Sequence, residues 1–118
     1  MTKKTKEAFL WIIKILRKNK IPYQISGGLA ARSYGSKRPL ADIDIEIHDK
    51  DFKKILPYVK NYALNGPINY KDSEFDIYGL FLEYKEQKID ICGADTQKLF
   101  NKKKKKWEKE KINLSKVV

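Results

Sequence analysis

The sequence predicts an α/β fold, in which a small mixed β-sheet is backed by helices, and three patterns carry that prediction. The chain opens with a helical repeat of apolar residues, continues with alternating isoleucines and acids, and then has two β-prone runs separated by a charged tripeptide. Its 118 residues are the length of one domain. We therefore expect a single unit over 1–118, with a Lys-rich C-terminal segment over 98–118.

The first element is predicted to be a helix over 5–20. Apolar residues recur there at helical spacing and would form one buried face: Phe9, Ile12, Ile13 and Leu16. Charged residues occupy the opposite face, and the helix is expected to end before Pro22, which disfavours helical backbone in the residue preceding it.

A strand, a glycine turn and a second helix are predicted next. Residues 23–26 are β-prone, Gly27 and Gly28 follow them, and residues 29–34 have a helix-forming composition. Glycines at such a turn let the backbone approach a phosphate closely, and the start of a helix supplies unpaired N–H groups.

The alternating segment over 42–48 is predicted to be a strand. Ile43, Ile45 and Ile47 would face the core, while Asp42 and Asp44 would leave the opposite face about 6.6 Å apart along the strand. Glu46 shares this acidic face and is a candidate for a supporting role.

Beyond that strand, residues 51–60 are predicted to form a helix with Asp49 or Asp51 as its N-cap. The Asn-Gly-Pro sequence at 65–67 indicates a turn.

The later part of the chain contains a predicted β-hairpin and a predicted helix. Residues 77–84 and 88–92 read as two strands joined by a short charged turn. Residues 96–111 are rich in Lys and are expected to be helical.

The positive charge of the chain is concentrated at its ends. The net charge is +11, but residues 1–20 contribute +6, residues 98–118 contribute +7, and residues 21–97 carry −2. Carboxylate chemistry is therefore expected in the middle of the chain. The net charge of the whole chain, taken alone, would have suggested nucleic-acid binding.

Several protein classes are excluded or disfavoured. The single cysteine, Cys92, cannot form an internal disulfide and is expected to be a small buried residue, and one His with one Cys cannot make a Cys/His zinc cluster. No apolar run approaches the roughly 20 residues of a membrane helix. We expect a cytoplasmic protein without a membrane span.

A third acid, Asp90, lies between two isoleucines in the second hairpin strand. If that strand lies beside the 42–48 strand, three carboxylates meet on one face of the sheet. Two carboxylates about 6 Å apart repel by roughly 2.8 kcal/mol at an effective dielectric near 20. A divalent cation such as Mg²⁺, which accepts carboxylates, waters and phosphate oxygens, would compensate that repulsion.

Together these residues resemble the active-site motif of the DNA polymerase β-like nucleotidyltransferase superfamily. The match consists of Ser-Gly-Gly at 26–28, Asp-Ile-Asp-Ile at 42–45, and the later Asp90. The resemblance implies the nucleotidyltransferase fold, Gly27 and Gly28 at a phosphate turn, and Asp42, Asp44 and Asp90 as catalytic metal ligands.

The segment that leads into Asp42 is similar to that of small antibiotic nucleotidyltransferases, which act on lincosamides or aminoglycosides. Ser36 and Arg38 fall in this segment and are candidates for binding the nucleotide, because Arg can bind phosphate through two hydrogen bonds. The resemblance implies a nucleoside triphosphate as substrate, Mg²⁺ as cofactor, and transfer of a nucleoside monophosphate to a hydroxyl group of a small molecule or protein.

Two other functions fit the sequence. A non-catalytic, antitoxin-like member of a two-protein system would bind a protein partner or a second copy of itself, and a basic nucleic-acid-binding module would use the terminal lysines. The Lys102–Lys106 run, with Phe100 and Trp107 beside it, is where a nucleic acid would bind, but the complete acid triad favours the enzyme.

Overall fold

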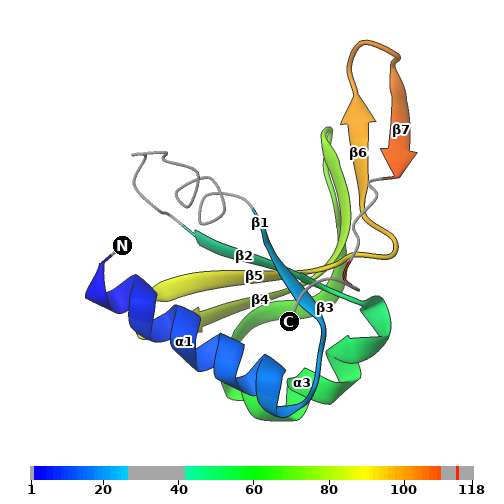
Figure 1. Ribbon diagram of the computed structural model, residues 1–118. Helices are drawn as coiled ribbons and strands as arrows, with labels where there is room; N and C mark the ends of the chain where they lie inside the picture. Colours follow the sequence, from blue (N-terminus) through cyan, green and yellow to red (C-terminus); the bar gives the residue numbers. More distant parts are fainter. Residues whose placement is uncertain (1, 27–41, 110–113, 115–118) are drawn as a thin grey trace.

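The computed structural model describes residues 2–26, 42–109 and 114 (Figure 1). Its helical elements are α1 (Lys3–Lys18), η1 (Asp49–Asp51), α3 (Phe52–Val59) and η2 (Lys60–Tyr62). Its strands are β1 (Tyr23–Ser26), β2 (Asp42–Ile47), β3 (Ala63–Lys71), β4 (Phe75–Tyr84), β5 (Gln87–Gly93), β6 (Lys98–Asn101) and β7 (Lys106–Lys109). None of the described helices is long and apolar enough to cross a lipid bilayer.

The strands form one mixed sheet in the order β1-β2-β5-β4-β6-β7, and β3 also pairs with β4. β2 and β5 are parallel, whereas the other pairs are antiparallel. Helices α1 and α3 lie against one face of the curled sheet, and the β6–β7 hairpin projects beyond the opposite face (Figure 1). A mixed sheet backed by helices is the predicted fold class.

Helix α1 forms where the apolar repeat predicted it. The Thr2 side chain caps its first turn by accepting a hydrogen bond from the Thr5 backbone N–H. The Thr5 hydroxyl in turn donates to Gln87 Oε1 at 2.7 Å. This buried hydrogen bond fixes the start of the helix to the start of β5.

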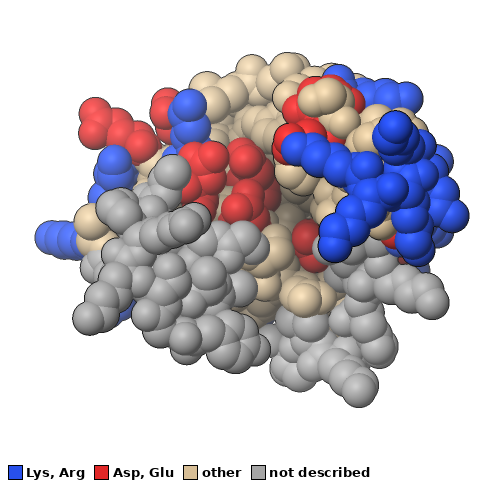
Figure 2. Space-filling model, turned by 90° about the horizontal axis from the view of Figure 1, so that it is seen from above, with Lys and Arg blue, Asp and Glu red and all other residues tan. Residues whose placement is uncertain are grey.

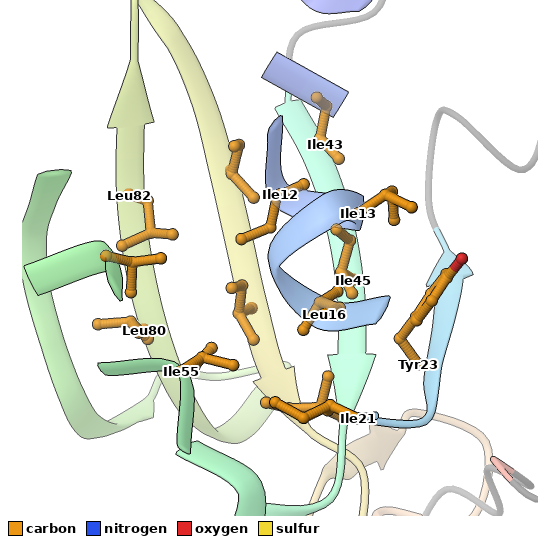
Figure 3. Close-up of a cluster of buried hydrophobic side chains, with 14 of the residues drawn as sticks. Ile12, Ile13, Leu16, Ile21, Tyr23, Ile43, Ile45, Ile55, Leu80 and Leu82 are labelled. Carbon is orange, nitrogen blue, oxygen red and sulfur yellow. The ribbon is translucent and has the colours of Figure 1, made fainter. Parts of the chain in front are cut away.

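The core lies between the two helices and the sheet. Alternate residues of the two central strands are fully buried: Ile43, Ile45, Ile47, Ile89 and Ile91. In Figure 3, Ile43 and Ile45 lie next to the core residues of α1. Burying an isoleucine side chain contributes about 1.5–3 kcal/mol, so this face is the main source of stability.

The predicted hairpin is confirmed as β4 and β5. Lys85 and Glu86, which connect the two strands, have φ angles of 47° and 70°. Two consecutive positive φ values are typical of the tight turns whose twist matches that of the flanking strands.

The helix predicted over 96–111 is wrong within the described residues, where β6 and β7 form a hairpin instead. Leu99 pairs with Phe75 of β4, which adds the hairpin to the sheet. Phe100 and Trp107 are cross-strand partners with ring centroids 5.4 Å apart. Lys favours helices only weakly, and these tertiary contacts override that preference.

The turn predicted over 65–67 is also wrong, because these residues lie inside β3. The Gly66–Pro67 peptide bond is cis, Gly66 has a φ of 104°, and the pairing with β4 shifts its register there. The turn-forming residues therefore produce an irregularity in a strand rather than a change of direction.

Asp51, one of the two residues predicted as N-cap of the helix after β2, is the N-cap residue of α3. Its side chain makes no capping hydrogen bond, however, and its carboxylate pairs with Lys54 Nζ at 3.2 Å. The Asp49 carboxylate instead accepts hydrogen bonds from the Asp95 N–H at 3.3 Å and the Thr96 hydroxyl at 2.7 Å.

Candidate active site

Two of the three predicted acids lie side by side on the central strands. β2 and β5 pair in a register that puts Asp44 directly beside Asp90, and neighbouring strands are about 4.8 Å apart. Asp42 lies two residues before Asp44, on the same face of β2. The isoleucines between these acids are buried on the other face, so the alternation in the sequence separates core from carboxylates.

Burial and neighbouring carboxylates raise the pKa of Asp44 and of Asp90. Partial burial, then the charges of Asp90 and Asp42, raises the pKa of Asp44 to about 6. Partial burial and the charge of Asp42 also raise the pKa of Asp90, against the opposing effect of Lys88. The patch therefore holds negative charge at a cost to the folded state.

Asp44 and Asp90 line a cleft with a volume of about 580 Å³. The other lining residues are mostly apolar and come from strands β1 to β6 and from the residue just before β6: Ser26, Glu46, Tyr70, Phe75, Ile77, Phe81, Cys92, Gln97 and Leu99. An acidic patch thus adjoins an apolar wall, which suits a ligand with both charged and apolar parts.

Sequence reasoning missed the aromatic wall of this cleft. In β4, Phe75, Ile77 and Phe81 alternate with residues of the core face, such as Leu80 and Leu82. The period of two was visible in the sequence, but no pattern indicated that the outer face of this strand would line the cleft.

Cys92 was expected to be buried, but it is half-buried in the cleft wall. It lies two residues after Asp90 and so shares its face of β5. Burial, followed by the charges of Asp90 and Asp44 and that of Glu46, raises the pKa of the Cys92 thiol to about 12. A thiol with this pKa is a poor nucleophile at neutral pH.

Hydrogen bonds join the ends of β2 and β5 beyond the carboxylates. Asp95 accepts from the Asp49 N–H at 2.8 Å, and its other oxygen lies 3.0 Å from His48 Nδ1. Burial is the largest single influence on the pKa of Asp95 and raises it, but the hydrogen bonds with His48 and the Asp49 N–H, together with nearby positive charge, outweigh burial and lower that pKa. This network links the segments that follow β2 and β5.

The donor set of the acidic patch fits a hard divalent cation, because Mg²⁺ accepts one or two carboxylates with waters and phosphate oxygens. Among the described residues, no three or more His, Cys, Asp and Glu side chains are arranged so that they could hold a metal ion. The carboxylates alone therefore do not form a complete cage, and ligand oxygens would have to complete the coordination.

The predicted nucleotide-binding residues Gly27, Gly28, Ser36 and Arg38 lie outside the described residues. The chain reaches them from Ser26, the last residue of β1. Ser26 is the register partner of Asp44 and lines the cleft. The Gly-Gly sequence is thus bonded to a residue that lies beside the carboxylates.

Comparison with known proteins gives one structural relative. A crystal structure of a "putative nucleotidyltransferase" from Thermotoga maritima superposes with a TM-score of 0.71 over 92% of this chain. The chain has a nucleotidyltransferase fold. Sequence identity to that protein is 17%, and the match spans 66% of its chain, so the likeness concerns the fold. No protein-family model and no curated protein matches the sequence.

This relative confirms the predicted nucleotidyltransferase fold. The closer similarity to antibiotic nucleotidyltransferases stays a prediction from the residues around Ser36 and Arg38.

Proposed function

We propose that the protein is a nucleotidyltransferase, which moves a nucleoside monophosphate from a nucleoside triphosphate to a hydroxyl group of a small molecule or protein. The observation that carries this proposal is the pairing of Asp44 with Asp90 on adjacent strands, at one side of a cleft large enough for a ligand. The fold shared with a protein described as a putative nucleotidyltransferase supports the proposal, and carboxylates that can bind Mg²⁺ are consistent with its chemistry.

The acidic patch lowers the stability of the protein. Asp44 would carry its charge more easily in the unfolded chain, as its raised pKa indicates. Groups that are held in an unfavourable state within a cleft are more often functional than structural. An asparagine would fill the same space without the repulsion.

In the proposed function Asp42 and Asp44 would hold Mg²⁺ together with the triphosphate, and Asp90 would complete the set. When bound, the ion would neutralise phosphate charge as the reaction proceeds. The proposal assigns Gly27 and Gly28 to the triphosphate through their backbone N–H groups, and Ser36 and Arg38 through their side chains.

The reaction exchanges one phosphorus–oxygen bond for another. The acceptor's hydroxyl oxygen forms a bond to the α-phosphorus, and the bond from that phosphorus to the α–β bridging oxygen breaks. Pyrophosphate leaves with the electron pair of the broken bond. The hydroxyl proton passes to the carboxylate of Asp90, which lies beside Asp44 on the neighbouring strand.

The first test is calorimetric titration of the protein with ATP, GTP, CTP and UTP, with and without Mg²⁺. We expect at least one triphosphate to bind in an Mg²⁺-dependent manner and the Asp42→Asn/Asp44→Asn variant to lose that binding. Glu83→Gln removes an exposed acid of β4 that does not line the cleft, so it serves as the matched control. Failure of every triphosphate to bind the wild type would refute the proposal.

A second variant separates binding from transfer. Asp90→Asn should retain much of the triphosphate binding but lose pyrophosphate release in the presence of an acceptor, because the proton acceptor is gone. Equal pyrophosphate release by this variant and the wild type would remove Asp90 from the mechanism.

A further inference from the structure

The β6–β7 hairpin concentrates positive charge on one side of the molecule. Residues 98–109 contain seven lysines and one acid, Glu108. In Figure 2 the lysines gather on one side of the visible face, across a hollow from the main group of carboxylates. Within the described residues, only two of these lysines form ion pairs: Lys102 with Glu74 at 3.2 Å, and Lys104 with Glu108 at 3.5 Å.

The lysines at the tip are not needed to form the turn. Asn101 Oδ1 accepts hydrogen bonds from the backbone N–H groups of Lys103 and Lys104 at 3.0 and 3.1 Å, and this closes the turn. Lys105 has a φ of 53°, a conformation that Gly or Asn adopts more easily. Five successive like charges also repel one another. The sequence thus departs from what folding favours, and recognition of an anion would account for the departure.

Aromatic rings accompany the lysines on one face of the hairpin. Phe100 and Trp107 are cross-strand partners, and alternation puts Lys98 and Lys109 on the same face. From β3, Lys71 Nζ lies 5.1 Å from the centroid of the Trp107 ring. Both aromatic side chains are only partly buried. The face therefore combines stacking surfaces with cations.

We propose that this hairpin binds single-stranded nucleic acid. Lysines at the tip would contact phosphates, and Phe100 or Trp107 would stack with unpaired bases, the combination by which proteins bind single strands without sequence preference. An acidic protein would use the lysines but has no flat bases for the rings. A duplex would keep its bases paired and leave the rings unused. The proposal is independent of the proposed transfer reaction.

The test is fluorescence anisotropy with a labelled oligouridylate of about 12 nucleotides, a length within the usual site sizes. For about four phosphate contacts, the logarithm of the association constant should fall with the logarithm of salt concentration at a slope of about −3. Lys103→Gln/Lys105→Gln/Lys106→Gln should reduce that slope by about two.

The matched control removes the same charge elsewhere. Lys14, Lys18 and Lys53 are exposed on α1 and α3 and form no ion pair within the described part of the chain, so Lys14→Gln/Lys18→Gln/Lys53→Gln should leave most of the affinity. Equal losses in the two triple variants would overturn the proposal, because binding would then follow total charge.

A substitution of the ring tests the stacking. Trp107→Leu should weaken binding about 5- to 100-fold, and Trp107→Tyr should restore much of it. A melting curve for each variant verifies that the hairpin variants are folded. Unchanged affinity in folded Trp107→Leu would overturn the proposal. Binding of two other polyanions tests the class of ligand. If polyglutamate or an RNA duplex bound as tightly as the single strand, the proposal would be overturned. Tight binding of polyglutamate would indicate an acidic protein partner instead.

Discussion

The two faces of β2 and β5 use the same strands for opposite purposes. On one face Ile43, Ile45 and Ile91 are fully buried beneath the helices. On the other face Asp44 and Asp90 lie next to each other at the side of a cleft. A strand pair that is strongly held by its apolar face can keep repelling charges on its other face, so stability and chemistry are separated by the pleat of the sheet.

The largest expected effect breaks the apolar face. Ile45→Ala leaves a cavity under α1 and should lower the free energy of unfolding by about 2–5 kcal/mol. Urea denaturation followed by circular dichroism measures the change. Ile45→Val, which removes a single methylene equivalent, should cost only about 0.5–1.5 kcal/mol. Similar values for the two variants would mean that this face is loosely packed.

The next effect has the opposite sign and concerns the acidic face. Asp44→Asn removes a half-exposed carboxylate whose pKa is raised to about 6, and after allowance for solvent screening it should stabilise the protein by about 1–2 kcal/mol at pH 7 in EDTA. The same variant should lose triphosphate binding. Stabilisation together with loss of binding would separate function from folding.

The pH dependence of stability follows from the same shift. The folded protein binds the Asp44 proton more tightly than the unfolded chain, so this group's cost is full above its folded pKa of about 6. As pH falls from 7 through 6 toward the ordinary value of 3.8, the contribution of Asp44 to stability should rise. The difference between wild type and Asp44→Asn in EDTA should therefore shrink over that range. A constant difference would contradict the assignment.

A smaller effect concerns the β4–β5 turn, which belongs to neither the apolar nor the acidic face of β2 and β5. Glu86 has a φ of 70° in the β4–β5 turn, where glycine is less strained, so Glu86→Gly should stabilise the protein by up to about 1 kcal/mol. Thermal melting measures the gain. Triphosphate binding should not change, because this turn does not line the cleft. Any loss of binding would show that the turn influences the acidic face.

The smallest effect uses Cys92 as a reporter of the acidic face. Its raised pKa of about 12 predicts slow alkylation by iodoacetamide at pH 8, where little thiolate is present. Asp90→Asn removes the charge that raises this pKa most and should accelerate alkylation several-fold, whereas Glu83→Gln should not. The gain is modest because burial, which Asp90→Asn leaves in place, is the main cause of the shift.

The sequence predicted the elements in which one pattern decides the structure. Alternating isoleucines gave β2, the helical repeat gave α1, and the pairing of the hairpin with β2 put Asp44 beside Asp90 as expected. Residues 96–111 were misassigned because lysines permit a helix, and their composition contains no information about the pairing of Leu99 with Phe75. The repulsion within the lysine run and the turn-forming Asn101 could have warned against a helix.

The aromatic wall of the cleft was unpredictable for a related reason. Tyr70 and Phe81 lie on strands whose outer faces could equally have been exposed to solvent, and only the curl of the sheet and the position of β6 make them line a cleft. Contacts between segments far apart in the sequence decide such features.

The parallel pairing of β2 with β5 has a consequence for the order of folding. α3, β3 and β4 lie between these strands in the chain, so bringing Asp44 beside Asp90 closes a long loop, and we expect this contact to form late in folding. Repulsion that arises only near the native state speeds unfolding more than it slows folding. The carboxylates should therefore shorten the lifetime of the folded protein while leaving the rate of its formation nearly unchanged.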